Sequence, residues 1–150
     1  MDTTDNTKDI YFKNILVAVD DSEDAIQAFK YAIHRAKKDD VGLAIVSILE
    51  DDEMNVFQAL NTDYVHGQRE DLEKHLEEYR KIALDSGVKD VKTIVASGDP
   101  GETIVKEVIP HVKPDLLIVG SKSKTGFTKR FGSQAAYMAK YAPISVLVIR

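Results

Sequence analysis

The sequence predicts an α/β protein in which one domain forms an open, five-stranded parallel sheet with helices on both faces. Short apolar runs rich in Val, Ile and Leu are typical of strands that are buried on both sides of a sheet. These runs alternate with segments in which apolar residues recur at the 3.6-residue period of a helix. The chain has 150 residues, of which 43% are hydrophobic, and this size and composition suit a single core.

The first third of the chain contains two predicted strands and one helix. Residues 14–20 form an apolar run that ends in an acid, and residues 43–49 form a second apolar run. Ser22 is placed to cap the helix between them, whose inner face holds Ile26, Phe29 and Ile33. Residues 50–64 then form an acidic connection that is longer than most loops in a compact domain.

Two further helices are predicted in the middle of the chain. The first covers about 67–86 and stops at Gly87. Its inner face holds Leu72, Leu76, Tyr79 and Ala83. The second begins at Asp99, Pro100 and Glu102, which supply an N-cap, a proline for the first helical position and a capping-box acid. Its apolar face holds Ile104, Val105, Val108 and Ile109.

The remaining strands are expected at 91–96, 115–120 and 144–149, with a short helix at 133–141 that ends before Pro143. In a doubly wound sheet, ligands bind at the carboxyl ends of neighbouring strands, where the strand order reverses. Polar residues follow the predicted strands at two such ends, after the first strand and after the fourth.

Composition excludes several classes of site. The chain has no cysteine, so disulfides, thiolate nucleophiles and Cys-based zinc sites are absent, and no two histidines have the spacing of a helical metal-binding pair. No run approaches the ~20 apolar residues that span a bilayer, and the polar segment 1–12 does not have the order of a signal peptide. We therefore expect a cytoplasmic protein with its domain at 13–150 and no membrane partner.

The charge of the chain is unevenly distributed. Residues 116–150 hold six basic and no acidic residues, whereas residues 1–115 hold 14 basic and 25 acidic residues. A nucleic-acid-binding domain is normally basic over a whole face. The pattern therefore favours a small anion as the ligand and argues against nucleic acid as a partner.

The segment after the fourth strand has the composition of a phosphate-binding loop. Gly120 and Gly132 let the backbone approach a ligand closely and adopt positive φ. Ser133 and the amides after it, including that of Gln134, open a helix whose N-terminus favours an anion. Hydroxyl groups that can donate to phosphate oxygens come from Ser121, Ser123 and Ser133. The alternative interpretation is a solvated surface loop in which the basic residues serve solubility, namely Lys122, Lys124, Lys129 and Arg130.

From Lys13 to Arg150 the sequence resembles the universal stress proteins. The resemblance rests on ILVAVDDSEDAIQAFKYAI, GDPGETIVKEV, PDLLIVGS and the ending GSQAAYMAKYAPISVLVIR, of which the last is the most specific. It implies a sheet in the order 3-2-1-4-5, as in the adenine nucleotide alpha hydrolase-like fold, so that the first and fourth strands are neighbours. It also implies a role in stress response.

In nucleotide-binding members of that family, residues after the first and second strands hold the adenosine, and the matching positions here are Val19, Asp20 and Ile48. The phosphates lie on a motif of Gly, two residues, Gly, nine residues, Gly and then Ser or Thr. Gly120, Gly132 and Ser133 match this motif, but Ser123 replaces the second glycine and only eight residues separate it from Gly132. The implied cofactor is ATP or another adenine nucleotide, together with Mg²⁺. The alternative is a nucleotide-independent stress or interaction module with the same fold.

An enzymatic function has little support. No P-loop, dinucleotide fingerprint or nucleophile elbow occurs, and slow ATP hydrolysis is the one activity left open. The start of the chain also looks like a receiver domain, but Ala96, Ser97 and Gly98 stand where the phosphoacceptor aspartate is needed. The apolar residues 144–149 would lie at a sheet edge in the implied order, which predicts a homodimer through this strand, as in many family members.

Overall fold

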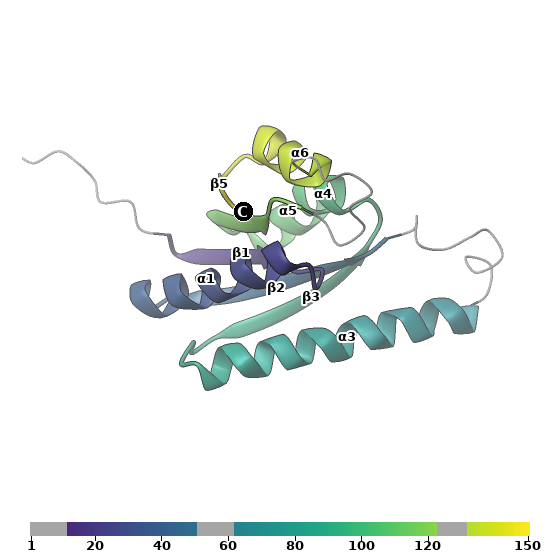
Figure 1. Cartoon of the computed structure of the whole chain (residues 1–150), viewed down its shortest axis with the longest axis horizontal. Coiled ribbons are helices and arrows are strands. Elements are labelled where there is room, and N and C mark those ends of the chain that lie inside the picture. Colours follow the sequence, from purple (N-terminus) through teal and green to yellow (C-terminus); the bar gives the residue numbers. More distant parts are fainter. Residues whose placement is uncertain (1–11, 51–61, 123–131) are drawn as a thin grey trace, which may run out of the picture.

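The computed structural model describes residues 12–50, 62–122 and 132–150. These residues form a five-stranded sheet in the order β3-β2-β1-β4-β5, and every neighbouring pair is parallel (Figure 1). The predicted fold class and strand order are therefore confirmed. The strands are β1 (Asn14–Ala18), β2 (Gly42–Leu49), β3 (Val91–Ser97), β4 (Leu116–Gly120) and β5 (Ser145–Ile149).

Helices cover both faces of the sheet. On one face lie α1 (Glu23–Asp39) and α3 (Thr62–Asp85), and on the other lie α6 (Ser133–Tyr141) and a segmented helix (Figure 1). The segmented helix consists of α4 (Pro100–Thr103), a π-helical turn (Ile104–Val108) and α5 (Ile109–Val112).

The core is divided by the sheet into two apolar layers. Ile15 and Val17 of β1 pack toward α1 and α3, whereas Leu16 between them packs toward the opposite layer. Leu16 and Val17 are both 0% exposed. This burial on both sides explains why the strand reads as a continuous apolar run rather than an alternating one.

The first helix begins as predicted, but its buried face differs from the prediction. The hydroxyl of Ser22 accepts a hydrogen bond from the backbone N–H of Ala25 at 3.1 Å, which caps α1. Phe29 is buried as expected, whereas Ile26 and Ile33 are only half-buried. Small side chains that let the helix approach the sheet closely occupy the centre of the buried face, namely Ala25, Ala28, Ala32 and Ala36.

The boundary between the acidic connection and α3 was predicted too late in the chain. The helix begins at Thr62 instead of Gly67, so the predicted connection 50–64 extends into the helix, and residues 51–61 lie outside the described part. Glycine inside a helix costs only about 1 kcal/mol relative to alanine, and the helix continues through Gly67. The predicted inward residues are confirmed, with Leu76 and Ala83 buried and Leu72 and Tyr79 half-buried.

The predicted capping box at Asp99 does not form. Pro100 is the first residue of α4 as expected, but the Asp99 side chain makes no capping hydrogen bond and instead accepts one from Gln134 Nε2 at 3.0 Å. Glu102 pairs with Lys106 at 2.7 Å. A long-range partner on α6 has therefore displaced the local capping interaction.

A π-helical turn interrupts the helix that follows. The backbone N–H of Ile109 donates to the carbonyl of Ile104, five residues back. Pro110 has no N–H to donate, and a proline ring in a regular helix would clash with the carbonyl four residues before it, so the turn widens by one residue. Ile104, Val108 and Ile109 are buried as predicted.

The structure bears only partly on the predicted domain boundary and on the expected lack of a membrane-spanning segment. Nearly all of the polar segment 1–12 lies outside the described residues, so the domain boundary stays a prediction. Among the described helices, none combines the length and apolarity that crossing a bilayer requires.

One carboxylate joins the beginnings of the two central strands. Asp115 accepts hydrogen bonds from the backbone N–H groups of Lys13 at 2.7 Å and Asn14 at 2.9 Å, while its own N–H donates to the Asn14 carbonyl at 3.0 Å. These bonds fix the register of β1 against β4.

We expect the Asp115→Ala variant to lose about 1–3 kcal/mol of unfolding free energy, because two backbone donors lose a charged acceptor. Urea denaturation followed by circular dichroism measures this loss. Asp115→Asn keeps one acceptor oxygen and should lose less. Equal stability of the alanine variant and the wild type would contradict this role of Asp115.

Candidate functional site

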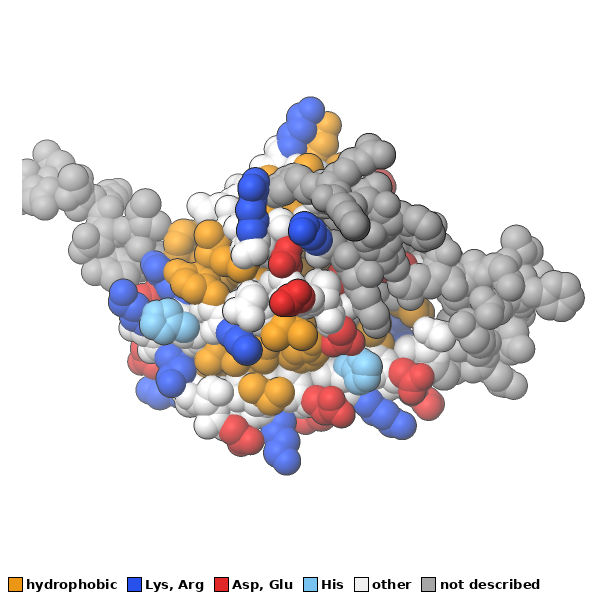
Figure 2. All heavy atoms as spheres, viewed as in Figure 1, with side chains coloured by type: hydrophobic (Ala, Val, Ile, Leu, Met, Phe, Trp, Pro, Cys, Tyr) orange, Lys and Arg blue, Asp and Glu red, His pale blue; other side chains and the backbone are white. Residues whose placement is uncertain are grey.

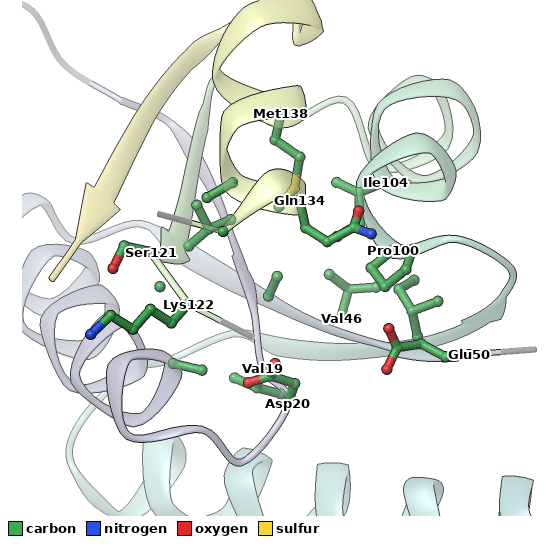
Figure 3. Close-up of a pocket in the computed structure, with 17 residues that line it drawn as sticks. Val19, Asp20, Val46, Glu50, Pro100, Ile104, Ser121, Lys122, Gln134 and Met138 are labelled. Atoms are coloured by element: carbon green, nitrogen blue, oxygen red, sulfur yellow. The ribbon is translucent and has the colours of Figure 1, made fainter. Parts of the chain in front are cut away.

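A cavity lies at the carboxyl ends of the two central strands, β1 and β4, and is bounded by α4 and α6 (Figure 3). This is the position at which the strand order reverses, as the sequence predicted. Seven of the nine predicted site residues line the cavity, namely Val19, Asp20, Ile48, Gly120, Ser121, Gly132 and Gln134.

Of the other two predicted site residues, one does not line the cavity and one cannot be placed. Ser133 is exposed at the start of α6, and Ser123 lies outside the described residues, so the predicted roles of both residues stay untested. The basic residues Lys124, Lys129 and Arg130 also lie outside the described part.

The cavity has an apolar wall and charged ends. Val46, Ile48, Ile104 and Met138 supply aliphatic and thioether groups. Figure 3 shows Lys122 and Glu50 at opposite ends, with Asp20 between them along the lower rim. The cavity encloses about 70 Å³. This volume is below the about 300 Å³ at the low end of ligand pockets, so a larger ligand has to extend beyond it or displace a wall residue.

The loop between β1 and α1 holds Asp20 in place. An oxygen of its carboxylate accepts the backbone N–H of Ser22 at 3.0 Å. The next residue, Asp21, has a φ of 63°, a left-handed conformation that few residues other than glycine adopt. The Ser22 hydroxyl also donates to the carbonyl of Lys122 at 3.3 Å, which joins this loop to the one after β4.

Ser121 is a junction of four elements. Its hydroxyl donates to Asp24 on α1 at 2.7 Å, its N–H donates to the carbonyl of Ile149 at the end of β5 at 2.7 Å, and its carbonyl accepts the N–H of Gly132 at 2.7 Å. The residue is 3% exposed. Its hydroxyl is therefore bound within the protein in this structure, and the predicted hydrogen bond to a phosphate stays a prediction.

The two glycines of the predicted motif have a different role from the expected one. Neither adopts positive φ, and that expectation is wrong. A Cβ on Gly120 would lie 2.7 Å from the backbone nitrogen of Ala25, and a Cβ on Gly132 would lie 2.5 Å from the carbonyl oxygen of Ser121. Both glycines lie close to the protein's own backbone, which leaves no room for a side chain, and the predicted close approach to a ligand stays a prediction.

The first turn of α6 has no side-chain cap. Gly132 occupies the N-cap position, and the helix has no hydrogen bond from a capping side chain. The side chain of Gln134 instead accepts the Gly101 N–H at 2.7 Å and donates to Asp99 at 3.0 Å, which joins α6 to the start of α4. Backbone N–H groups without a capping side chain at a helix N-terminus suit an anion.

Sequence reasoning missed several residues that line the cavity. Glu50 follows β2 as Asp20 follows β1, so its position at a strand end was a usable signal. Ile104 and Met138 lie on helices whose proximity follows only from the pairing of α4 with α6, and nothing in their local sequence indicates it.

A second cavity of about 180 Å³ lies between α3 and the carboxyl ends of β1 and β2. Here Asp21 accepts a hydrogen bond from the Tyr79 hydroxyl at 2.6 Å and pairs with His75 Nδ1 at 3.2 Å. Burial of the phenol and the adjacent Asp21 carboxylate raise the pKa of Tyr79 above its ordinary value, so the hydroxyl stays protonated as a donor. Within the described residues, no three acidic or histidine side chains gather in a way that would hold a metal ion.

Comparisons with known proteins agree with this architecture. The model of the Universal stress protein family matches residues 11–150. A Staphylococcus aureus protein named as a universal stress protein is 33% identical over 143 residues, which cover 94% of this chain and 86% of that protein.

Solved structures share the fold. The universal stress protein UspA from Lactobacillus plantarum has a TM-score of 0.83 at 23% identity, covering 95% of this chain and 100% of that chain. A universal stress protein in complex with cAMP has a TM-score of 0.67 at 22% identity, covering 94% and 98%. The universal stress protein from Archaeoglobus fulgidus in complex with dAMP has a TM-score of 0.68 at 19% identity, covering 94% and 100%.

We expect Gly120→Ala and Gly132→Ala each to lose about 1–3 kcal/mol of stability, because the added Cβ meets backbone atoms that cannot move aside independently. Denaturant unfolding of the purified variants measures the loss. Gly42→Ala is the matched control, since its Cβ would meet the side-chain oxygen of Asp90 at 3.2 Å. The control should lose less than the other two variants, and Gly120→Ala and Gly132→Ala variants that unfold at the wild-type midpoint would contradict this role of the two glycines.

Proposed function

This chain belongs to the universal stress protein family, and from that premise we propose that it binds an adenine nucleotide in the cavity between the ends of β1 and β4. The observation that carries this proposal is the convergence of seven predicted site residues from separate parts of the chain on one cavity. That two proteins of the same fold have been solved with cAMP and with dAMP supports the choice of ligand class.

The charges along the cavity suggest the orientation of the ligand. Lys122 and the uncapped first turn of α6 lie at one end, and they suit phosphate groups. The apolar wall with Ile48 and Met138 suits the flat base. Carboxylate oxygens accept hydrogen bonds, so Asp20 suits the ribose hydroxyls. Mg²⁺ would enter with the phosphates as part of the ligand.

A second candidate function is a stress or interaction module that acts without a nucleotide. Two observations favour it: the cavity of about 70 Å³ is small, and the hydroxyl of Ser121 is already bound to Asp24. Nucleotide binding would then require the wall to open, at a cost in free energy that reduces affinity. The two candidates differ in whether the purified protein binds a nucleotide at all.

We also propose that the protein forms a homodimer through β5 in the cytoplasm. The strand is at the edge of the sheet and pairs with β4 on one side. Its first residue is exposed and the other four are half-buried, so none of its apolar side chains is fully covered. An edge strand with uncovered apolar side chains is suited to pairing with another chain.

We expect isothermal titration calorimetry to detect saturable binding of ATP, ADP or AMP in the presence of Mg²⁺. Lys122→Glu should weaken ATP binding at least about tenfold, equivalent to ~1.4 kcal/mol, while adenosine binding stays unchanged, because the side chain would contact only phosphates. Lys92→Glu on the edge strand β3 makes the same charge change away from the cavity and should have no effect.

The absence of binding for every adenine ligand, together with no nucleotide released when freshly purified protein is denatured, would favour the second candidate. Phosphate release in the same samples tests slow ATP hydrolysis. Gly132→Val is unsuitable for this purpose, because its side chain would clash with Ser121 in the unliganded fold.

Light scattering should give a mass of at least 33.4 kDa, twice the 16.7 kDa of one chain. A charge placed among the half-buried side chains of the edge, Val148→Lys, should weaken the β5 contact at least about tenfold, because it must be desolvated on pairing. Ser145→Lys, at an exposed position of the same strand, is the control. A wild-type mass of 16.7 kDa at high concentration would rule the dimer out.

A further inference from the structure

An apolar groove runs between α1 and α3, on the side of these helices that does not contact the sheet. It encloses about 570 Å³. Its floor contains the rings of Phe29 and Tyr79, and its walls contain Ile26, Ile33 and Ile82. Ile82 is 51% exposed, one of only two large hydrophobic side chains so exposed in the described residues. In Figure 2, hydrophobic side chains are visible between charged side chains on the face that carries both helices.

The two helices run side by side in the same direction. The rings of Phe29 and Tyr79 meet edge to face with centroids 4.8 Å apart, which places these residues at the same level of the groove. At the far end, the Lys37 side chain approaches to 3.3 Å from where a Cβ on Gly87 would lie. Residues of α1 therefore lie beside residues about 50 positions later in the chain, in α3 and in the turn that follows it.

We propose that this groove, hereafter the α1–α3 groove, is a contact surface for a second copy of the same chain. The two copies would be related by a two-fold axis that runs along the groove, so that α1 of each copy lies over α3 of the other. This inference depends on the shape and charge of the groove and not on nucleotide binding.

Two opposite charges that line the groove are complementary about such an axis. Lys30 lies on the α1 side and Glu78 lies on the α3 side, near the level of the Phe29 and Tyr79 rings. The two-fold operation exchanges the α1 and α3 sides without changing the level. Lys30 of each copy then faces the Glu78 position of the other, giving two equivalent ion pairs. An axis across the groove would instead place the two α1 helices against each other and would not pair Lys30 with Glu78.

The apolar side chains fit the same arrangement. Ile82 stands on α3 at the level of Ile33 on α1, since the two helices are offset by about 50 residues. Under the two-fold operation, the exposed Ile82 of each copy is placed over Ile33 of the other. The same contact therefore forms twice, once in each copy's groove, which is the pattern of an isologous interface.

The extent of the surface predicts a weak contact. The 17 residues of α1 span about 25 Å, and two neighbouring helices are about 20 Å wide, so each copy could bury about 500 Å². The total of about 1,000 Å² is at the lower limit for a specific interface. The contact should therefore depend strongly on concentration, unlike a permanent dimer.

Sedimentation velocity over a range of concentrations tests the proposal. Ile82→Glu, Lys30→Glu and Glu78→Lys should each weaken the concentration-dependent association at least about tenfold, because each variant introduces an unpaired or repelled charge in the contact. The decisive sample is an equimolar mixture of Lys30→Glu and Glu78→Lys. In a mixed dimer, the two substituted positions face each other with opposite charges, and the unchanged Lys30 of one variant faces the unchanged Glu78 of the other, so association should return.

Lys38→Glu and Glu70→Lys are the matched controls, since they make the same charge changes at exposed positions that do not line the groove. The two controls should behave as the wild type does. Val148→Lys, which acts at the β5 edge, should leave the effect of Ile82→Glu in place. The proposal is overturned if Ile82→Glu sediments as the wild type at all concentrations, or if the mixture fails to associate. A peptide that copurifies with the wild type but not with Ile82→Glu, while both proteins sediment alike, would also overturn it.

Discussion

The carboxyl end of β4 lies directly against the first turn of α1, and the arrangement of the candidate site depends on this contact. Gly120 has no side chain, so its backbone approaches the backbone of Asp24 and Ala25 at a distance that a Cβ would prevent. Ser121 is thereby brought within hydrogen-bonding distance of Asp24. From this fixed position, Ser121 binds the end of β5 and the residue before α6. One missing side chain thus sets the relative positions of four elements.

Most of the fold followed from the sequence, because parallel strands buried on both faces leave a clear apolar pattern. The features that did not follow depend on distances between segments. The capping box at Asp99 was predicted from local sequence, but Gln134, 35 residues later, competes for the same carboxylate. The buried alanine face of α1 was missed because alanine is only weakly hydrophobic and adds little to a periodic pattern. The prediction followed larger residues such as Ile26, which line the groove between the helices instead.

The candidate site was located by topology and only partly by residue chemistry. Strand ends at a reversal of strand order meet at one place, which is why seven of nine predicted residues share a cavity. The chemistry of individual groups was less predictable. The hydroxyl of Ser121 suits a phosphate, yet it binds Asp24 within the protein. A sequence shows which groups can donate a hydrogen bond, whereas the fold decides which acceptor they reach first.

The π-helical turn at Ile104–Val108 sets how the two ends of the helix over the cavity are rotated relative to each other about the helix axis. One residue of an α-helix corresponds to a rotation of about 100°. A homologue that lacked one residue in this turn would recover a regular hydrogen-bond ladder. It would do so by rotating the start of the helix, including Ile104, by that angle relative to Ile109, and an apolar side chain would leave the cavity wall. The length of this turn is therefore a marker of cavity shape that a comparison of residue identities alone would overlook.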